Sequence, residues 1–472
     1  MRIVKNYLYN AGYQIFLLMV PLITTPYIAR VLGPHGVGIN SFTNSIIQYF
    51  VLFGSIGINL YGNREIAYHR DDKRQMSRIF WEIEILRIVA IIAASGAFLV
   101  FMLFEQKYHV YLLMQSLLII AAAFDISWFF MGIEDFKTTV LRNTLVKLLS
   151  IILIFLLVKS TSDIAIYILI ISSSQLLGNF TLWPYLRKRL LKISFRDLNV
   201  WRHFRPTLVL FIPQIATQIY LVLNKTMLGS LSGVVAAGLF DNSDKIIKMV
   251  LAVVTATGTV MLPRVANVFV QGNIKKVNLY LYNTFDFVTF SSIPLLFGLA
   301  AIAPKFSLWF FGAKFTGIDR IIMIEAPAIL MIAWNSAIGN QYLLPTNRNK
   351  AFTVSVTIGA IVNLIVNIPL ITYFGAIGAA FSTVISEASV TGYQIYIIRK
   401  QIKIPKLLAD VWKYLCAGIL MFVIVYMMNT NLPFNIIMLI IEVLVGIFVY
   451  GLGIFLLRPK ILKQLKLFLK NK

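Results

Sequence analysis

The sequence is poor in cysteine, histidine and charge, and these shortages exclude several classes of protein. Only 13% of the 472 residues are charged and 59% are hydrophobic, whereas soluble proteins have about 25% charged residues. A water-soluble fold is therefore excluded. Cys416 is the one cysteine, so an internal disulfide is excluded, and the four histidines show no metal-ligand spacing. Because the sequence has no phosphate loop, HExxH or GxSxG motif, we expect no ATP hydrolysis, no cofactor and no metal.

Long apolar runs account for most of the chain. About 20 apolar residues cross a bilayer, and the sequence divides into fourteen apolar segments close to this length. We therefore predict an all-α polytopic membrane protein with about 14 transmembrane helices. The predicted spans are residues 11–31, 36–58, 79–104, 109–131, 143–158, 164–185, 207–229, 235–260, 281–303, 319–341, 351–373, 376–398, 414–429 and 434–457.

Basic residues outnumber acidic ones and collect on one side of the predicted membrane. The chain has 43 Lys and Arg residues against 19 Asp and Glu residues, a net charge of +24. In a soluble protein this excess would suggest nucleic acid. Here 33 basic residues fall on the side that holds both termini and six fall on the other side. Since cytoplasmic loops are rich in Lys and Arg, we predict that both termini are cytoplasmic and that nucleic acid is not a partner.

The second half of the sequence repeats the first. Matching residues lie 200 positions apart, among them Arg64 and Arg264, and the first two predicted spans match the seventh and eighth as a block. Transporters built from such parallel repeats bind their substrate between the lobes and rock them. We predict two six-helix lobes, residues 1–200 and 201–400, and an additional helix pair with a basic cytoplasmic tail, residues 401–472.

Polar and charged side chains lie inside several predicted spans. A charge there costs about 2.5–3.5 kcal/mol on insertion scales, so it is expected to face a water-filled cavity or a partner. The predicted cavity cations, which would bind substrate, are Arg30, Arg64, Lys225, Lys245, Lys248 and Arg264. The predicted polar or ion-coupling residues are Asn44, Gln48, Asp125, Gln218, Asn224, Asp241, Asp244 and Glu325.

Several of these charges also have a purely structural interpretation. The four charges of the eighth span form two acid–lysine pairs spaced four residues apart, which would neutralise each other. Arg30 could extend to the outer interface, and Arg64 and Arg264 could be ordinary positive-inside anchors. We favour a cavity, because a neutral helix would serve a structural role at lower cost.

Short motifs along residues 1–400 resemble those of polysaccharide transporters. The run ARVLGPHGVG (29–38) resembles the first-loop signature of the Wzx-type lipid-linked oligosaccharide flippases, which belong to the multidrug/oligosaccharidyl-lipid/polysaccharide exporter superfamily. The further matching motifs are GINLYGNREIA (57–67), NKTMLG (224–229), MLPR (261–264), LLPTNRNK (343–350) and GAIGAAFSTVISE (375–387). One departure is Asn224, where relatives often carry an acid before the lysine.

The resemblance implies a secondary transporter and not an enzyme. It implies a flippase in a bacterial cytoplasmic membrane that moves undecaprenyl-pyrophosphate-linked oligosaccharide repeat units for surface polysaccharide biosynthesis, by alternating access of a cationic central cavity. The implied partners are this substrate, membrane lipids, a polysaccharide polymerase and glycosyltransferases, with proton or sodium coupling.

Three other functions stay open. A drug–cation antiporter of the same superfamily is the alternative within transport, although the first span carries Arg30 and no acid. A membrane glycosyl polymerase or transferase is the alternative of another class, and the short outward loops speak against it. A scaffold in a polysaccharide assembly complex would not need its cavity charges.

Overall fold

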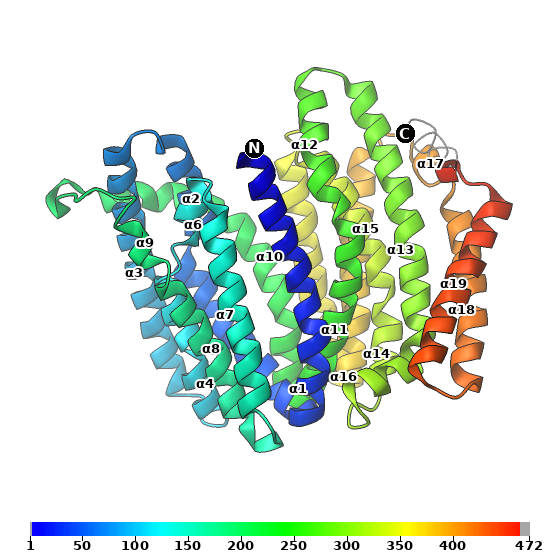
Figure 1. Cartoon of the computed structure of the whole chain (residues 1–472). Coiled ribbons are helices and arrows are strands. Elements are labelled where there is room, and N and C mark those ends of the chain that lie inside the picture. Colours follow the sequence, from blue (N-terminus) through cyan, green and yellow to red (C-terminus); the bar gives the residue numbers. More distant parts are fainter. Residues whose placement is uncertain (1, 463–472) are drawn as a thin grey trace. The chain divides into compact units, whose positions relative to one another are not determined.

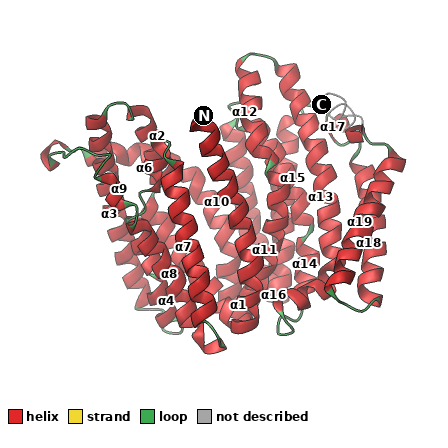
Figure 2. Cartoon of the chain, in the orientation of Figure 1, coloured by secondary structure: helices red, strands yellow, loops and turns green. Residues whose placement is uncertain are grey.

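The computed structural model describes the backbone of residues 2–462. It also describes the side chains of this range, except those of residues 2–11, 14, 15, 136, 212–214, 216, 217, 219–221, 257, 259 and 260. Every regular element in residues 2–462 is a helix, and no strand occurs there (Figure 2). The predicted all-α fold is therefore confirmed. Most of the predicted basic tail, residues 463–472, lies outside the described residues.

The chain divides by its internal packing into two units, unit 1 (Met1–Ser230) and unit 2 (Leu231–Lys472). The predicted boundaries at residues 200 and 400 concern the internal repeat and stay a prediction. Figure 1 labels most helices of unit 1. The helices of this unit are α1 (Arg2–Ser55), α2 (Ile58–His69), α3 (Lys73–Met102), α4 (His109–Gln115), α5 (Leu117–Ala123), α6 (Ser127–Gly132), α7 (Phe136–Leu157), α8 (Ile164–Phe180), α9 (Trp183–Leu186) and α10 (Phe204–Leu231), with 3₁₀ turns η1 (Thr161–Asp163), η2 (Phe195–Asp197) and η3 (Val200–His203).

Unit 2 is helical in the same way and contains one π-helical segment. Its elements are α11 (Val234–Thr255), α12 (Thr257–Val270), α13 (Ile274–Phe311), α14 (Ile318–Glu325), α15 (Pro327–Asn335), the π-helix η4 (Ser336–Leu343), α16 (Asn349–Ile398), α17 (Ile404–Leu407), α18 (Val411–Asn431) and α19 (Ile436–Leu457). α14, α15 and η4 follow one another almost without interruption, so together they occupy the tenth predicted span.

Two long helices, α1 and α16, each contain two predicted spans joined by a sharp break. The break in α1 lies at Gly33 (φ 67°, ψ 178°), between the first two predicted spans. The break in α16 lies at Gly375 (φ 56°, ψ −130°), between the eleventh and twelfth. L side chains rarely adopt these positive φ values, whereas glycine does so readily. Each pair of spans is therefore joined through a single glycine instead of a loop.

The helices cover all fourteen predicted spans. Within the described residues, ten stretches are long and apolar enough to cross a membrane. Two of these ten, Phe16–His69 and Asn349–Ile398, each contain two predicted spans, and α10 and α11 occupy the seventh and eighth. The arrangement is compatible with a count of fourteen and is that of a multi-span helical membrane protein.

Aromatic side chains of α3 and α6 form the core of unit 1. Phe80 and Trp128 are fully buried and stack with their ring centroids 5.5 Å apart, while Phe129 meets Phe80 edge-on at 5.2 Å. α2 approaches this core closely at Gly62, where a Cβ atom would lie 2.4 Å from the Trp128 ring. The core thus holds α2 and α6 against α3, which carries the buried charges described below.

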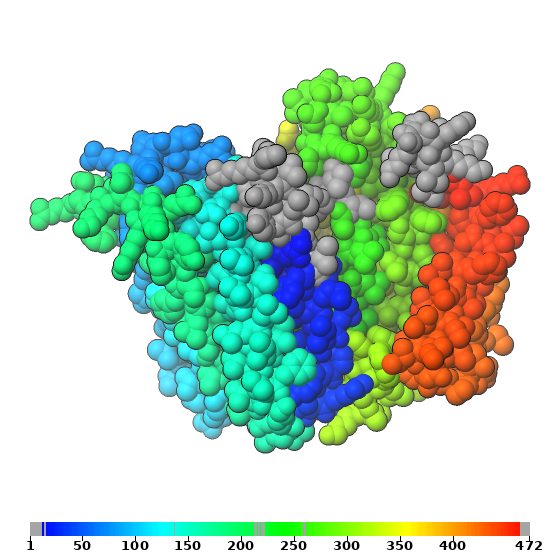
Figure 3. Space-filling view, in the orientation of Figure 1, coloured from blue at the N-terminus to red at the C-terminus, as the bar shows by residue number. Residues whose placement is uncertain are grey.

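In unit 2, α18 and α19 pack on α13 (Figure 1). The Tyr414 hydroxyl donates to Asp286 Oδ1 at 2.7 Å, and the Tyr450 hydroxyl donates to the Phe290 carbonyl at 2.9 Å. Figure 3 shows the surface of α18 and α19 in orange and red. This pair exposes large apolar side chains such as Phe448, which is 69% exposed. Such a surface suits contact with lipid.

Candidate functional site

Two of the predicted cations lie on α1 and α2 at the surface of unit 1. Arg30 is exposed and lies one turn before the break at Gly33. Arg64 is also exposed, and its Nη2 lies 3.2 Å from Glu65 Oε1. The Arg64 guanidinium carbon is 5.4 Å from the centre of the Tyr61 ring. Arg64 is therefore held on the α2 surface by its own helix.

The C-terminal part of α10 packs on the second half of α1. The Thr226 hydroxyl donates to Ser45 Oγ at 2.9 Å, and Gly229 lies so close to Phe42 that a Cβ atom would overlap the ring. This contact brings together two predicted polar segments of unit 1. The predicted site residues on them are Asn44 and Lys225, both half-buried, Asn224, which is buried, and Gln218, which is exposed.

A polar cavity of about 240 Å³ lies inside unit 1. Two of the predicted residues, Gln48 and Asp125, share its wall. The polar side chains that line it are Gln48, Ser55, Asn59, Arg87, Asp125, Gln175 and Asn179. The cavity therefore carries both signs of charge, together with amide groups that donate and accept hydrogen bonds.

Arg87 is the best-buried cation of this cavity, being only 1% exposed. It donates to the Asp125 carbonyl and to Asn59 Oδ1, and its guanidinium carbon lies 5.8 Å from the centre of the Trp128 ring. Glu84, three residues earlier on α3, is fully buried, and neither of its carboxylate oxygens has a hydrogen-bond partner among the described residues. The positive charge of Arg87 therefore lies near the Glu84 carboxyl group, although the two side chains form no hydrogen bond.

Glu82 of α3 holds the segment between α9 and α10. Its side chain is fully buried and accepts from Arg202 Nε at 2.9 Å, from His203 Nε2 at 2.8 Å and from the Asn199 backbone N–H at 2.7 Å. Arg78 of α3 adds a contact at 3.0 Å. One buried carboxylate therefore fixes the start of α10 to α3.

Burial lowers the pKa of His203, and the hydrogen bond to Glu82 offsets this only in part. The folded protein then keeps His203 neutral at pH values where the unfolded chain, with a pKa of about 6.5, takes up a proton. We expect the stability of the wild type in detergent to fall as the pH drops below about 6.5. A His203→Gln variant should lose less stability over the same range, as measured by melting temperature against pH. Parallel curves for the two proteins would contradict this expectation.

The four charges of α11 form two ion pairs. Lys245 Nζ lies 2.5 Å from Asp241 Oδ2, and Lys248 Nζ lies 2.7 Å from Asp244 Oδ2. The acids are nearly buried, whereas the two lysine side chains are 39% and 45% exposed. On the same helix the Ser243 hydroxyl donates to Glu325 Oε2 at 2.6 Å, which joins α14 to α11.

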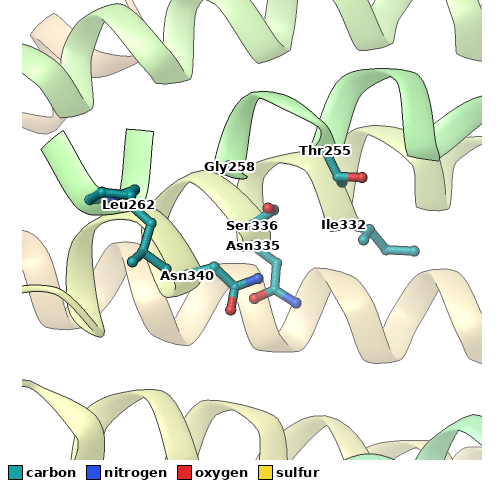
Figure 4. Close-up of a pocket in the computed structure, with 8 residues that line it drawn as sticks. Thr255, Gly258, Leu262, Ile332, Asn335, Ser336 and Asn340 are labelled. Atoms are coloured by element: carbon teal, nitrogen blue, oxygen red, sulfur yellow. The ribbon is translucent and has the colours of Figure 1, made fainter. Parts of the chain in front are cut away.

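A second cavity, of about 420 Å³, opens in unit 2 between α11, α12, α15 and η4 (Figure 4). Its polar lining side chains are Thr255, Asn335, Ser336 and Asn340. Asn335 is oriented by Gln394 Nε2, which donates to Asn335 Oδ1 at 2.8 Å. The predicted cation Arg264 is exposed on α12, directly after the lining residue Pro263.

The structure thus groups some of the predicted residues and leaves others apart. Gln48 and Asp125 share a cavity, and Glu325 joins the α11 cluster through Ser243. Arg30 and Arg64 are exposed on α1 and α2 of unit 1, and Arg264 is exposed on α12 of unit 2.

Several buried polar residues were not among the predicted site residues. Glu82, Glu84 and Arg87 lie within one predicted apolar span, 79–104. Burying charge in a membrane span is costly, so these three charges could have been identified from the sequence as candidate functional residues. Asn335 and Asn340 are five residues apart, a spacing that α-helical periodicity does not place on one face.

Comparison with known proteins gives a consistent result. Residues 3–269 match the family described as "Polysaccharide biosynthesis protein". The chain is 27% identical over 403 residues to the Escherichia coli (strain K12) protein named "Putative O-antigen transporter". That match covers 84% of this chain and 96% of the relative.

Two solved structures share the fold. The structure titled "Lipid II flippase MurJ, inward closed conformation" has a TM-score of 0.76 at 17% identity and covers 95% of this chain and 98% of that chain. The inward-facing structure of a multidrug resistance MATE family transporter of the MOP superfamily has a TM-score of 0.65 at 13% identity and covers 82% and 95%. At these identities the likeness concerns the fold alone.

Proposed function

The chain belongs to the polysaccharide biosynthesis protein family, as a membrane transporter of the multidrug/oligosaccharidyl-lipid/polysaccharide exporter superfamily, and we propose that it carries undecaprenyl-pyrophosphate-linked oligosaccharide repeat units. The observation that carries this proposal is the similarity over 84% of the chain to a protein named as an O-antigen transporter. The proposed carrier exposes a cationic cavity alternately to each side of the membrane.

The chemistry of such a cargo explains why the carrier needs cations. A diphosphate and many sugar hydroxyls cannot cross hydrocarbon unassisted, because burying unpaired charge is prohibitive. Lys and Arg side chains replace the lost hydration through charge-assisted hydrogen bonds. The proposed cations are Arg30, Arg64, Lys225, Lys245, Lys248 and Arg264.

The ion pairs of α11 are compatible with this role. The ammonium group of a lysine has three hydrogen-bond donors, and an ion pair with one aspartate occupies only some of them. Since the Lys245 and Lys248 side chains are 39% and 45% exposed, each keeps a surface for a second anion. A diphosphate would therefore bind beside the aspartates without displacing them.

The acids are proposed to serve ion coupling. A proton or sodium ion exchanged at a carboxylate would supply direction to the transport cycle. The candidates for this exchange are Asp125, Asp241, Asp244 and Glu325. We further propose that both termini are cytoplasmic, that glycosyltransferases supply the cargo and that a polymerase consumes it.

Removal of two of the proposed cavity cations tests the proposed function. We expect Arg30→Gln combined with Lys225→Gln to lower the export of surface polysaccharide at least about tenfold, since each lost charge-assisted contact is worth about 1.5–3 kcal/mol. Export is measured by glycan blotting of cells that lack the chromosomal gene and carry the variant. The charge-conserving variants Arg30→Lys and Lys225→Arg should restore most of the activity.

A matched control separates cavity charge from overall charge. Lys275→Gln with Lys276→Gln removes the same charge from the exposed start of α13 and should leave export unchanged. Wild-type export by the Arg30/Lys225 variant, at equal amounts of protein in the membrane, would overturn the proposal. Resistance to cationic dyes on overexpression would instead support a drug–cation antiporter.

A further inference from the structure

The cavity of unit 2 differs in chemistry from the cavity of unit 1. None of the described residues that line the unit 2 cavity is charged, whereas Arg87 and Asp125 line the unit 1 cavity. The two cavities thus offer different chemistry to a ligand.

The π-helix η4 arranges the polar side chains of the unit 2 cavity. A π-helix takes more residues per turn than an α-helix and bonds each N–H to the carbonyl five residues earlier. The Leu344 N–H bonds the Gly339 carbonyl in this way at 3.0 Å. Residues that are five apart in the sequence therefore lie on the same face of this helical segment. Figure 4 shows the side-chain amides of Asn335 and Asn340 next to each other.

A buried amide that has no hydrogen-bond partner among the described residues lies behind the cavity wall. Gln341 is 3% exposed, and among the described residues neither of its amide atoms has a hydrogen-bond partner. It lies against the lining residue Gly258, where a Cβ atom would come within 3.2 Å of Gln341 Nε2. The absence of a side chain at Gly258 thus lets the Gln341 amide pack directly behind this part of the cavity wall.

We propose that this cavity binds uncharged sugar residues of the lipid-linked cargo, a proposal that rests on the proposed function. Sugar hydroxyls both donate and accept hydrogen bonds, as do the amides and hydroxyls of Asn335, Asn340 and Ser336. The volume of about 420 Å³ lies within the range of small-molecule sites, about 300–1,000 Å³.

Other parts of the cargo fit the cavity less well. A diphosphate requires cations, and none of the described lining side chains is one. A polyprenyl tail would contact the apolar part of the lining but would leave the hydrogen-bonding groups of Thr255, Asn335, Ser336 and Asn340 unused. The sugar is the part of the cargo that is uncharged and rich in hydrogen-bonding groups.

Binding of two lipids that differ by one sugar tests the proposal. The probes are undecaprenyl diphosphate and undecaprenyl diphosphate carrying one N-acetylglucosamine, and the protein is full-length and reconstituted in nanodiscs. We expect the sugar to tighten binding about tenfold in the wild type. In Asn340→Leu this gain should shrink to less than about threefold, while the affinity for undecaprenyl diphosphate itself stays unchanged, which also shows that the variant is folded.

The control and a second variant make the outcome decisive. Asn267→Leu places the same substitution on an exposed position of α12 and should keep the full sugar gain. Ser336→Ala removes one hydroxyl with little change of volume and should reduce the gain in part. An unreduced gain in Asn340→Leu, or no gain in the wild type, overturns the sugar site. If undecaprenyl diphosphate does not bind the wild type at all, the proposed function fails instead.

Discussion

Replacing Glu82 by alanine is expected to lower the free energy of unfolding by about 2–3 kcal/mol. The variant would leave a buried His203 and the Asn199 N–H without their acceptor. Arg78 and Arg202 contribute less to the loss, because their side chains are 41% and 40% exposed and regain water. The change is measured by reversible unfolding in mixed micelles.

Proteolysis gives a second readout of the same variant. The segment 187–205 contains several arginines and lysines, and Glu82 holds it to α3. Glu82→Ala should therefore speed tryptic cleavage in this segment. Glu65→Ala, which removes the partner of exposed Arg64, should change stability by no more than about 1 kcal/mol and leave cleavage as it is. Equal cleavage rates in Glu82→Ala and the wild type would show that the carboxylate does not hold the segment.

Replacing Arg87 by methionine is expected to destabilise unit 1 by about 3–5 kcal/mol, the usual effect of removing one charge from a buried charged cluster. The substitution deprives Asn59 Oδ1 and the Asp125 carbonyl of their donor. It also leaves the buried Glu84 carboxyl without the nearby positive charge. The loss is measured by unfolding of the purified protein in detergent.

A second substitution identifies the role of Glu84. If the Arg87 charge compensates Glu84, then Arg87→Met with Glu84→Gln should be more stable than Arg87→Met alone. Arg320→Met, at an exposed position of α14, should stay within about 0.5 kcal/mol of the wild type. No recovery in the double variant would mean that Arg87 stabilises unit 1 only through its hydrogen bonds.

Hydropathy predicted the helices well because each span needs a long apolar run. The connections were harder to predict, since they depend on single backbone angles. The sequence LGPHG indicates a break, with glycine at a helix end and proline at the next start. Hydropathy does not reveal that Gly33 alone makes the connection at φ 67°.

The candidate site was predicted in part. The spacing of four residues in the eighth span indicated that Asp241 and Lys245 lie within reach of each other, and they form an ion pair. The anchor at Glu82 was not predicted, because its partner Arg202 is 120 residues away in the chain. Contacts between distant segments depend on tertiary packing, which helical periodicity does not describe.

The wide turn of η4 changes the register of the helix that contains it. A relative with one residue fewer between Ala333 and Leu344 would close an ordinary α-helical turn there. If the missing residue lies after Asn340, the two asparagines stay five apart and point in different directions on the α-helix, whereas a loss between them leaves them four apart on one face. A single-codon deletion between Asn340 and Leu344 would therefore disrupt the proposed sugar site while every lining residue kept its identity.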